Sequence, residues 1–118
     1  MSLKKDIINK LSVLPKLEGL EQNKIILATS IGLVTGRLPN EEEFSDSTNP
    51  QYVPLNVCSN AADEYRNKLA LSEKAELPGN DGCIYLVDVV IKSSEHTYSL
   101  PFLALFYDQI IGASIGSN

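Results

Sequence analysis

The chain has 118 residues, of which 43% are hydrophobic and 21% charged, and its formal net charge is −5. This is the composition of one ordinary folded domain, and it excludes an intrinsically disordered chain. The acidic balance disfavours nonspecific nucleic-acid binding, because such binding needs clustered lysine and arginine side chains to neutralise phosphates. We therefore expect a single domain over residues 1–118 that does not bind DNA.

An amphipathic helix is predicted at the N-terminus. Apolar residues recur at helical spacing over residues 2–14, with polar residues between them. Ser2 can cap this helix, and Pro15 ends it. The apolar stripe is narrow, which is typical of a terminal helix that packs on its own domain, although docking to a partner helix or to a membrane stays open.

A β-hairpin is predicted next. The stretch KIILATSIGLVTGRL, residues 24–38, is rich in β-branched residues and is broken at Gly32. Gly36 lies inside the second arm, where it predicts a bulge or a bend. No phosphate-binding glycine motif surrounds either glycine.

A polar insertion is predicted over residues 39–82. Its first part holds the acidic residues Glu41, Glu42, Glu43 and Asp46, which we interpret as a solvated loop. A weak divalent-cation site is the alternative, but the spacing fits no calcium loop. A second helix is predicted over residues 60–71, capped by Ser59 or Asn60, and a turn follows at residues 78–82.

The segment CIYLVDVVI, residues 83–91, reads as a strand. Strict alternation would place Tyr85, Val87, Val89 and Ile91 on one face, and Ile84, Leu86, Asp88 and Val90 on the other. Asp88 is unexpected in such a row. A hydrogen-bonded or interface-facing aspartate is favoured over a catalytic acid, because no partner residue is evident. His96, the only histidine, follows in the next turn.

Two further strands are predicted at the C-terminal end, over residues 100–106 and 110–115, with Tyr107, Asp108 and Gln109 between them. The first of these strands is apolar at every position, so both of its faces need cover from a helix, another sheet or a second subunit. The apolar run is too short and too interrupted to span a membrane. We expect a cytoplasmic protein without a membrane partner.

Cys58 and Cys83 show no metal-binding spacing with each other or with His96. Buried thiols are favoured over a disulfide, which stays geometrically possible. The sequence predicts no metal site, no cofactor and no catalytic residue.

The order of these elements resembles the Sm-like (LSm) family, in which an N-terminal helix precedes a five-stranded, strongly bent antiparallel barrel. The resemblance rests on NKIILATSIGLVTGRL, similar to the first two strands, and on FLALFYDQIIGASIG, similar to the last two. Small barrels of the SH3 type share this pattern. The expected fold is thus mainly β with two helices, a small bent five-stranded barrel with an N-terminal helix and a helical insertion.

The sequence departs from the family where RNA-binding members carry an Arg-Gly or similar basic pair. Tyr107, Asp108 and Gln109 stand in that turn. Tyr107 could stack a base and Gln109 could hydrogen-bond one, while Asp108 opposes a phosphate. The resemblance therefore implies ring assembly more than RNA binding.

Three classes of function remain open at this point: an oligomeric interaction or scaffold module, an RNA-binding ring, and an enzyme that uses Asp88, His96 or the acidic loop. We rank them in that order. The first class predicts a homo-oligomer, a ring in which residues 101–106 pair with residues 110–115 of a neighbouring copy. The expected interface residues are Pro101, Phe102, Leu103, Leu105, Ile110, Ile111 and Ile115.

Overall fold

The structure is a computed structural model that describes residues 2–72 and 75–117. Its elements in chain order are α1 (Leu3–Val13), a 3₁₀ turn (Leu14–Lys16), β1 (Lys24–Thr29), β2 (Gly32–Arg37), α2 (Glu41–Ser45), α3 (Tyr52–Lys68), β3 (Cys83–Lys92), β4 (Thr97–Phe106), a second 3₁₀ turn (Tyr107–Gln109) and β5 (Ile110–Gly116). The architecture is mixed: one antiparallel sheet, an N-terminal helix and a helical insertion.

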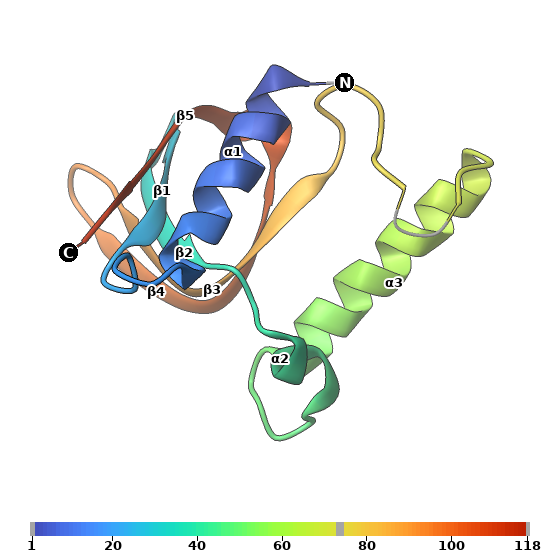
Figure 1. The fold of residues 1–118 in the computed structure, drawn as a ribbon, viewed down its shortest axis with the longest axis horizontal. Helices are drawn as coiled ribbons and strands as arrows, with labels where there is room; N and C mark the ends of the chain where they lie inside the picture. Colours follow the sequence, from blue (N-terminus) through green and yellow to red (C-terminus); the bar gives the residue numbers. More distant parts are fainter. Residues whose placement is uncertain (1, 73–74, 118) are drawn as a thin grey trace.

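The sheet contains five strands in the order β4-β3-β2-β1-β5, and every neighbouring pair is antiparallel. Helix α1 lies across one face of the sheet, and α3 stands apart on the other side of β3 and β4 (Figure 1). The core fills the space between α1 and the sheet. It consists of Ile8, Ile25, Leu27, Val34, Ile84, Leu86, Val89, Tyr107 and Ile110.

Helix α1 confirms the predicted N-terminal helix. The Ser2 hydroxyl accepts a hydrogen bond from the Lys5 amide and caps it, as expected. Ile8 is fully buried against the strands, so the helix packs on its own domain. Pro15 lies in the 3₁₀ turn that ends the helix.

The predicted hairpin is confirmed as β1 and β2, joined at Ser30 and Ile31. The predicted bulge at Gly36 is confirmed as well, because the register between β2 and β3 shifts there. A Cβ atom at Gly36 would lie 3.2 Å from the Cβ of Leu86. This close approach of β2 to β3 favours glycine at the position.

Strict alternation along β3 is wrong, and Asp88 is the reason. Asp88 has φ of 52°, a left-handed conformation, and marks the extra residue of β3 opposite Gly36 of β2. Because a bulge changes which side chains share a face, Val89 joins Ile84 and Leu86 in the core. The prediction had placed Val89 on the opposite face from those two residues.

The insertion is more helical than the sequence predicted. Residues 41–45, expected to be loop, form the short helix α2, and α3 begins at Tyr52 rather than near residue 60. Pro54 lies in the first turn of α3. Backbone N–H groups there have no hydrogen-bond acceptor within the helix, so proline, which lacks an N–H, is tolerated. Leu55 is fully buried and fixes this first turn. The predicted caps at residues 59 and 60 therefore lie inside the helix.

The expected barrel does not close. Strands β4 and β5 lie at opposite edges of the sheet and do not pair with one another, and the sheet is not strongly curled. A 3₁₀ turn of three residues carries the chain from β4 over the end of the core to β5, which pairs with β1. Among residues 2–72 and 75–117, no further strand pairs with the outer side of β4 or of β5.

Candidate functional site

The two free sheet edges are the first candidate for function. Neither β4 nor β5 contains a charged residue. Large apolar side chains are exposed along both edges, with relative exposures of 57% at Phe106 and 74% at Ile111. Edge strands of this kind present backbone donors and acceptors to any chain that can add a strand.

The predicted interface residues divide into two groups. Pro101 and Ile111 are exposed, and Phe102 is half-buried with its ring centroid 6.1 Å from that of Tyr85. Leu103, Leu105 and Ile115 pack against the core, and Ile110 is fully buried within it. Residues of the second group could contribute backbone hydrogen bonds to an added strand, but their side chains face the core.

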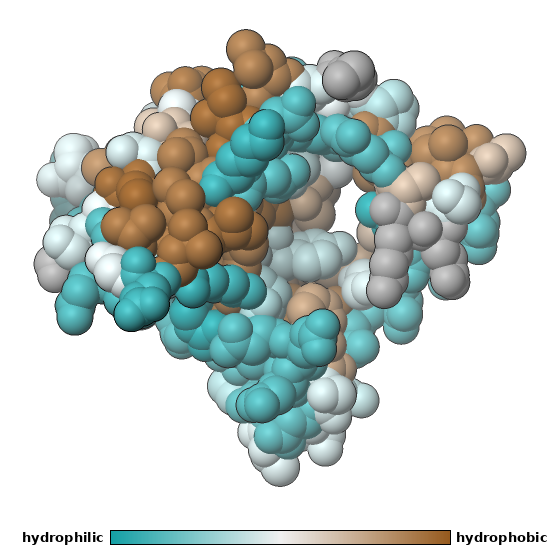
Figure 2. Space-filling view, in the orientation of Figure 1, coloured by the Kyte–Doolittle hydropathy of each residue, from teal (hydrophilic) through white to brown (hydrophobic). Residues whose placement is uncertain are grey.

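An apolar surface continues from the β5 edge onto α1. Ile7 of α1 and Ile111 of β5 line one shallow hollow, and Lys4 borders it. Leu3 is 75% exposed at the start of the same helix. Hydrophobic residues accordingly gather over α1 and the neighbouring strands at the upper left of Figure 2.

The two residues predicted to contact RNA lie in different environments. Tyr107 is buried beneath α1, and its hydroxyl donates a hydrogen bond to Asn9 Oδ1 at 3.0 Å. Gln109 is exposed, and its side-chain nitrogen lies 3.4 Å from Asp108 Oδ1. The structure therefore offers no exposed ring at Tyr107 on which a base could stack.

Arg37 connects the insertion to the sheet. Its guanidinium donates from Nη1 and Nη2 to the two carboxylate oxygens of Glu43, at 2.8 and 3.1 Å, and from Nε to Asp88 Oδ2 at 2.8 Å. Glu43 Oε1 also accepts the Asn40 amide at 2.8 Å. The hydrogen bonds from Arg37 are the largest cause that lowers the pKa of Glu43 below its ordinary value. Asp88 thus has an ion-pair partner, as one of the sequence interpretations expected.

The Glu43→Gln variant should lower the free energy of unfolding by about 2 kcal/mol at neutral pH, because a paired, nearly buried carboxylate is lost. Since folding lowers the pKa of Glu43, its stabilisation is present above the unfolded pKa of about 4.3 and disappears as pH falls through the folded pKa. Urea unfolding at neutral and acidic pH measures this. Glu42→Gln, on the exposed side of α2, is the control; equal losses in both variants would contradict the role of the ion pair.

The second candidate is a cleft between α3 and the strands β3 and β4, visible as an opening in Figure 2. Its apolar part is a hollow of about 290 Å³ walled by α3, the start of β3 and the end of β4. A more polar hollow of about 150 Å³ adjoins it and reaches α1. The two hollows share walls formed by Ala62, Leu77, Asp81, Gly82, Cys83 and Tyr85.

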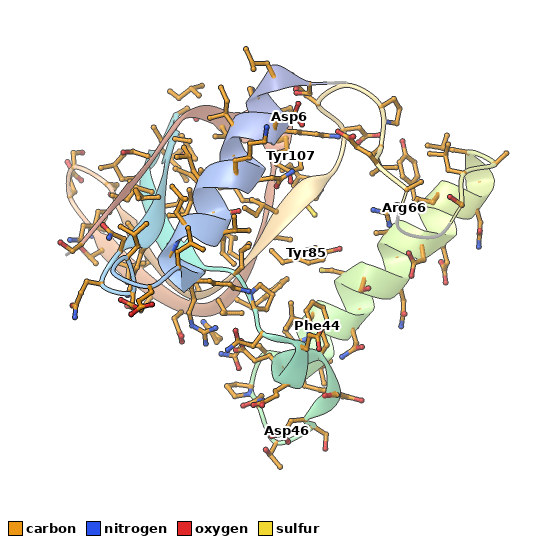
Figure 3. All side chains as sticks on the ribbon, in the orientation of Figure 1. Asp6, Phe44, Asp46, Arg66, Tyr85 and Tyr107 are labelled. Carbon is orange, nitrogen blue, oxygen red and sulfur yellow. The ribbon has the colours of Figure 1, made fainter. Side chains whose placement is uncertain are left out.

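Side chains from opposite walls converge in this cleft. Arg66 projects from α3 and Tyr85 from β3 into the space between them (Figure 3). Burial raises the pKa of Tyr85 to about 12, so its hydroxyl stays protonated at neutral pH. Cys58 and Cys83 both line the apolar part as free thiols, and burial raises the pKa of Cys83. No local sequence pattern indicates this cleft, because its walls are far apart along the chain.

The structure does not bring His96 or the described acidic residues together into a site. His96 is exposed, with its ring centroid 6.0 Å from that of Tyr98. In residues 2–72 and 75–117, no group of three or more histidine, cysteine, aspartate or glutamate side chains is placed to hold a metal ion. Within the same part of the chain, no helix is long and apolar enough to span a bilayer.

Comparison with known proteins gives no relative: no protein-family model, no curated protein and no solved structure matches the chain. The candidate sites are therefore judged on their geometry.

Proposed function

We propose that this protein is a homo-oligomeric interaction or scaffold module of the Sm-like type, whose copies associate through the edges β4 and β5. The observation that carries the proposal is the presence of two bare, apolar edges on opposite sides of one sheet. An N-terminal helix followed by five antiparallel strands, as expected from the family resemblance, supports it.

An uncovered edge strand exposes backbone donors and acceptors that can pair with another chain. Natural proteins protect an exposed edge with charged side chains, prolines or bulges. Pro101 is the one proline on β4, and β5 has neither a proline nor a charge. Addition of β5 from one copy to β4 of the next would satisfy both edges.

Such a contact joins two different surfaces, so a pair of copies still offers a free β4 at one end and a free β5 at the other. Head-to-tail contacts of this kind close into a ring when the rotation between copies allows it. Static light scattering after size exclusion tests the proposal, since it yields the mass of the particle.

An RNA-binding ring is the second candidate function, and the surface favours it less. Fluorescence anisotropy with U-rich and A-rich oligonucleotides should reveal no binding tighter than micromolar near physiological salt, because Asp108 occupies the turn and Tyr107 is buried. Any weaker binding should decrease as salt rises, since it would depend on phosphate contacts. A nanomolar dissociation constant would reverse the ranking of the two functions.

An enzyme is the third candidate, and we assign it no catalytic residue. Asp88 is paired with Arg37, and His96 lies on the surface beside Tyr98. Neither forms part of a described cluster of reactive side chains.

A further inference from the structure

We propose that the cleft between α3 and the strands β3 and β4 binds a small amphipathic anion: a carboxylate held near Lys5 and Arg66, with an aliphatic body in the apolar hollow. The site shares Ala104 and Phe106 with the edge strand β4, but it takes a small ligand and goes beyond assembly of the protein. The juxtaposition that supports it is a buried positive charge at one end of the cleft and an apolar cavity at the other.

Lys5 supplies the buried positive charge. It is 3% exposed and lines the polar part of the cleft, where its ammonium donates to the Leu77 carbonyl oxygen at 2.9 Å. Its Nζ also lies 5.3 Å from the centroid of the Tyr107 ring. The ion pairs among the described residues are formed by Arg37 and Arg66, so Lys5 has no carboxylate partner among them. Buried charges are normally paired, so a bound anion would compensate this one.

Arg66 adds a second cation to the same part of the cleft. Its Nε donates to the Ala75 carbonyl oxygen at 2.6 Å, and its Nη1 reaches Asp63 Oδ1 at 3.3 Å. Within the described residues Nη2 makes no hydrogen bond. A guanidinium with one long contact to a carboxylate retains donors for a ligand, and charge-assisted bonds from it would fix a carboxylate group.

Two acids also line the polar part, and their positions determine where an anion could sit. Both oxygens of Asp81 accept hydrogen bonds, one from the Tyr65 hydroxyl at 2.8 Å and the other from the Gly82 amide at 2.9 Å. Glu76 is exposed. The carboxylate is therefore placed at the Lys5 and Arg66 side, where the Tyr85 hydroxyl is a further donor.

The apolar hollow determines the body of the ligand. Its walls include Tyr65 of α3 and Ala104 and Phe106 of β4, and its volume is about 290 Å³. Small-molecule sites combine an apolar cavity of this order with a few convergent polar groups. A medium-length fatty acid meets both requirements.

Titration calorimetry with octanoate, octanol and octylamine tests the proposal, because the three probes share one chain and differ in charge. Octanoate should bind about tenfold more tightly than octanol, and octylamine should bind least. Equal affinity for octanoate and octanol, tighter binding of octylamine, or no heat of binding with octanoate up to millimolar concentration would overturn the proposal.

Variants locate the two halves of the site. Arg66→Gln should weaken octanoate binding about tenfold and leave octanol unchanged, whereas Lys68→Gln, an exposed cation of the same helix, should change neither. Ala61→Phe, at an exposed position that lines the hollow, should weaken both probes. Unchanged octanoate binding in Arg66→Gln would contradict the site. Dissociation of an assembly by octanoate would assign the hollow to a contact between copies and would also overturn it.

Discussion

Replacing Leu86 by alanine should lower the free energy of unfolding by about 2 to 5 kcal/mol. Leu86 is fully buried on β3, at the centre of the core between α1 and the sheet. The variant loses apolar burial and leaves a cavity that close-packed neighbours fill only in part. Because the free energy of unfolding of such domains is only about 5 to 15 kcal/mol, the variant would lose much of its stability.

Leu33→Ala is the matched control for this variant. Leu33 is the same residue type on the neighbouring strand β2, but it is 49% exposed. The Leu33→Ala substitution should lower the free energy of unfolding by about 1 kcal/mol or less. Urea unfolding followed by circular dichroism measures both variants, and equal costs would mean that β3 does not run through the core as described.

Replacing Ile111 by lysine should reduce the mass of the assembly to that of smaller species. Ile111 is 74% exposed in the single chain, so the substitution should hardly affect folding of one copy. If β5 adds to β4 of a neighbour, the new charge is buried without a partner, at a cost of several kcal/mol. Size exclusion with static light scattering detects the change.

Ile31→Lys is the control for charge and hydropathy. Ile31 is 70% exposed in the turn between β1 and β2 and belongs to neither edge strand. Its variant should keep the mass of the unmodified protein. An equal fall in mass for both variants, or none for Ile111→Lys, would contradict pairing through β5. Leu105→Lys is less informative, because Leu105 packs against the core and its loss would disturb folding.

Much of the fold could be predicted from local patterns. The N-terminal helix, the hairpin with its bulge at Gly36, and the three C-terminal strands follow from helical spacing, β-branched runs and turn residues. These signals reside within a few consecutive residues. The expected barrel closure does not follow from them, since closure depends on how far the sheet bends.

The errors arise where tertiary contacts override local patterns. The second helix was expected to begin near residue 60, yet Leu55 is fully buried and α3 begins at Tyr52. Asp88 interrupts the alternation of β3, because its left-handed backbone forms a bulge and its carboxylate pairs with Arg37. Glu43 was expected to be a solvated acid of the loop, but the fold places Arg37 where it forms an ion pair with Glu43.

The two candidate sites also differ in how far local sequence patterns predict them. The apolar edges could be predicted, since β4 and β5 are apolar and uncharged in the sequence itself. The cleft could not, because Lys5, Arg66 and Tyr85 belong to three elements separated by long stretches of chain. A buried lysine within an amphipathic helix also looks like any other polar residue of its outer face.

The mass of the unmodified protein in solution distinguishes a closed ring from a single copy. Static light scattering after size exclusion, at micromolar concentration, should give one particle whose mass is several times the 12.9 kDa of the chain. The mass should be an integral multiple of the chain mass, because a closed ring has a fixed number of copies. A single species of 12.9 kDa would contradict assembly through β4 and β5 and would mean that both apolar edges remain uncovered in solution.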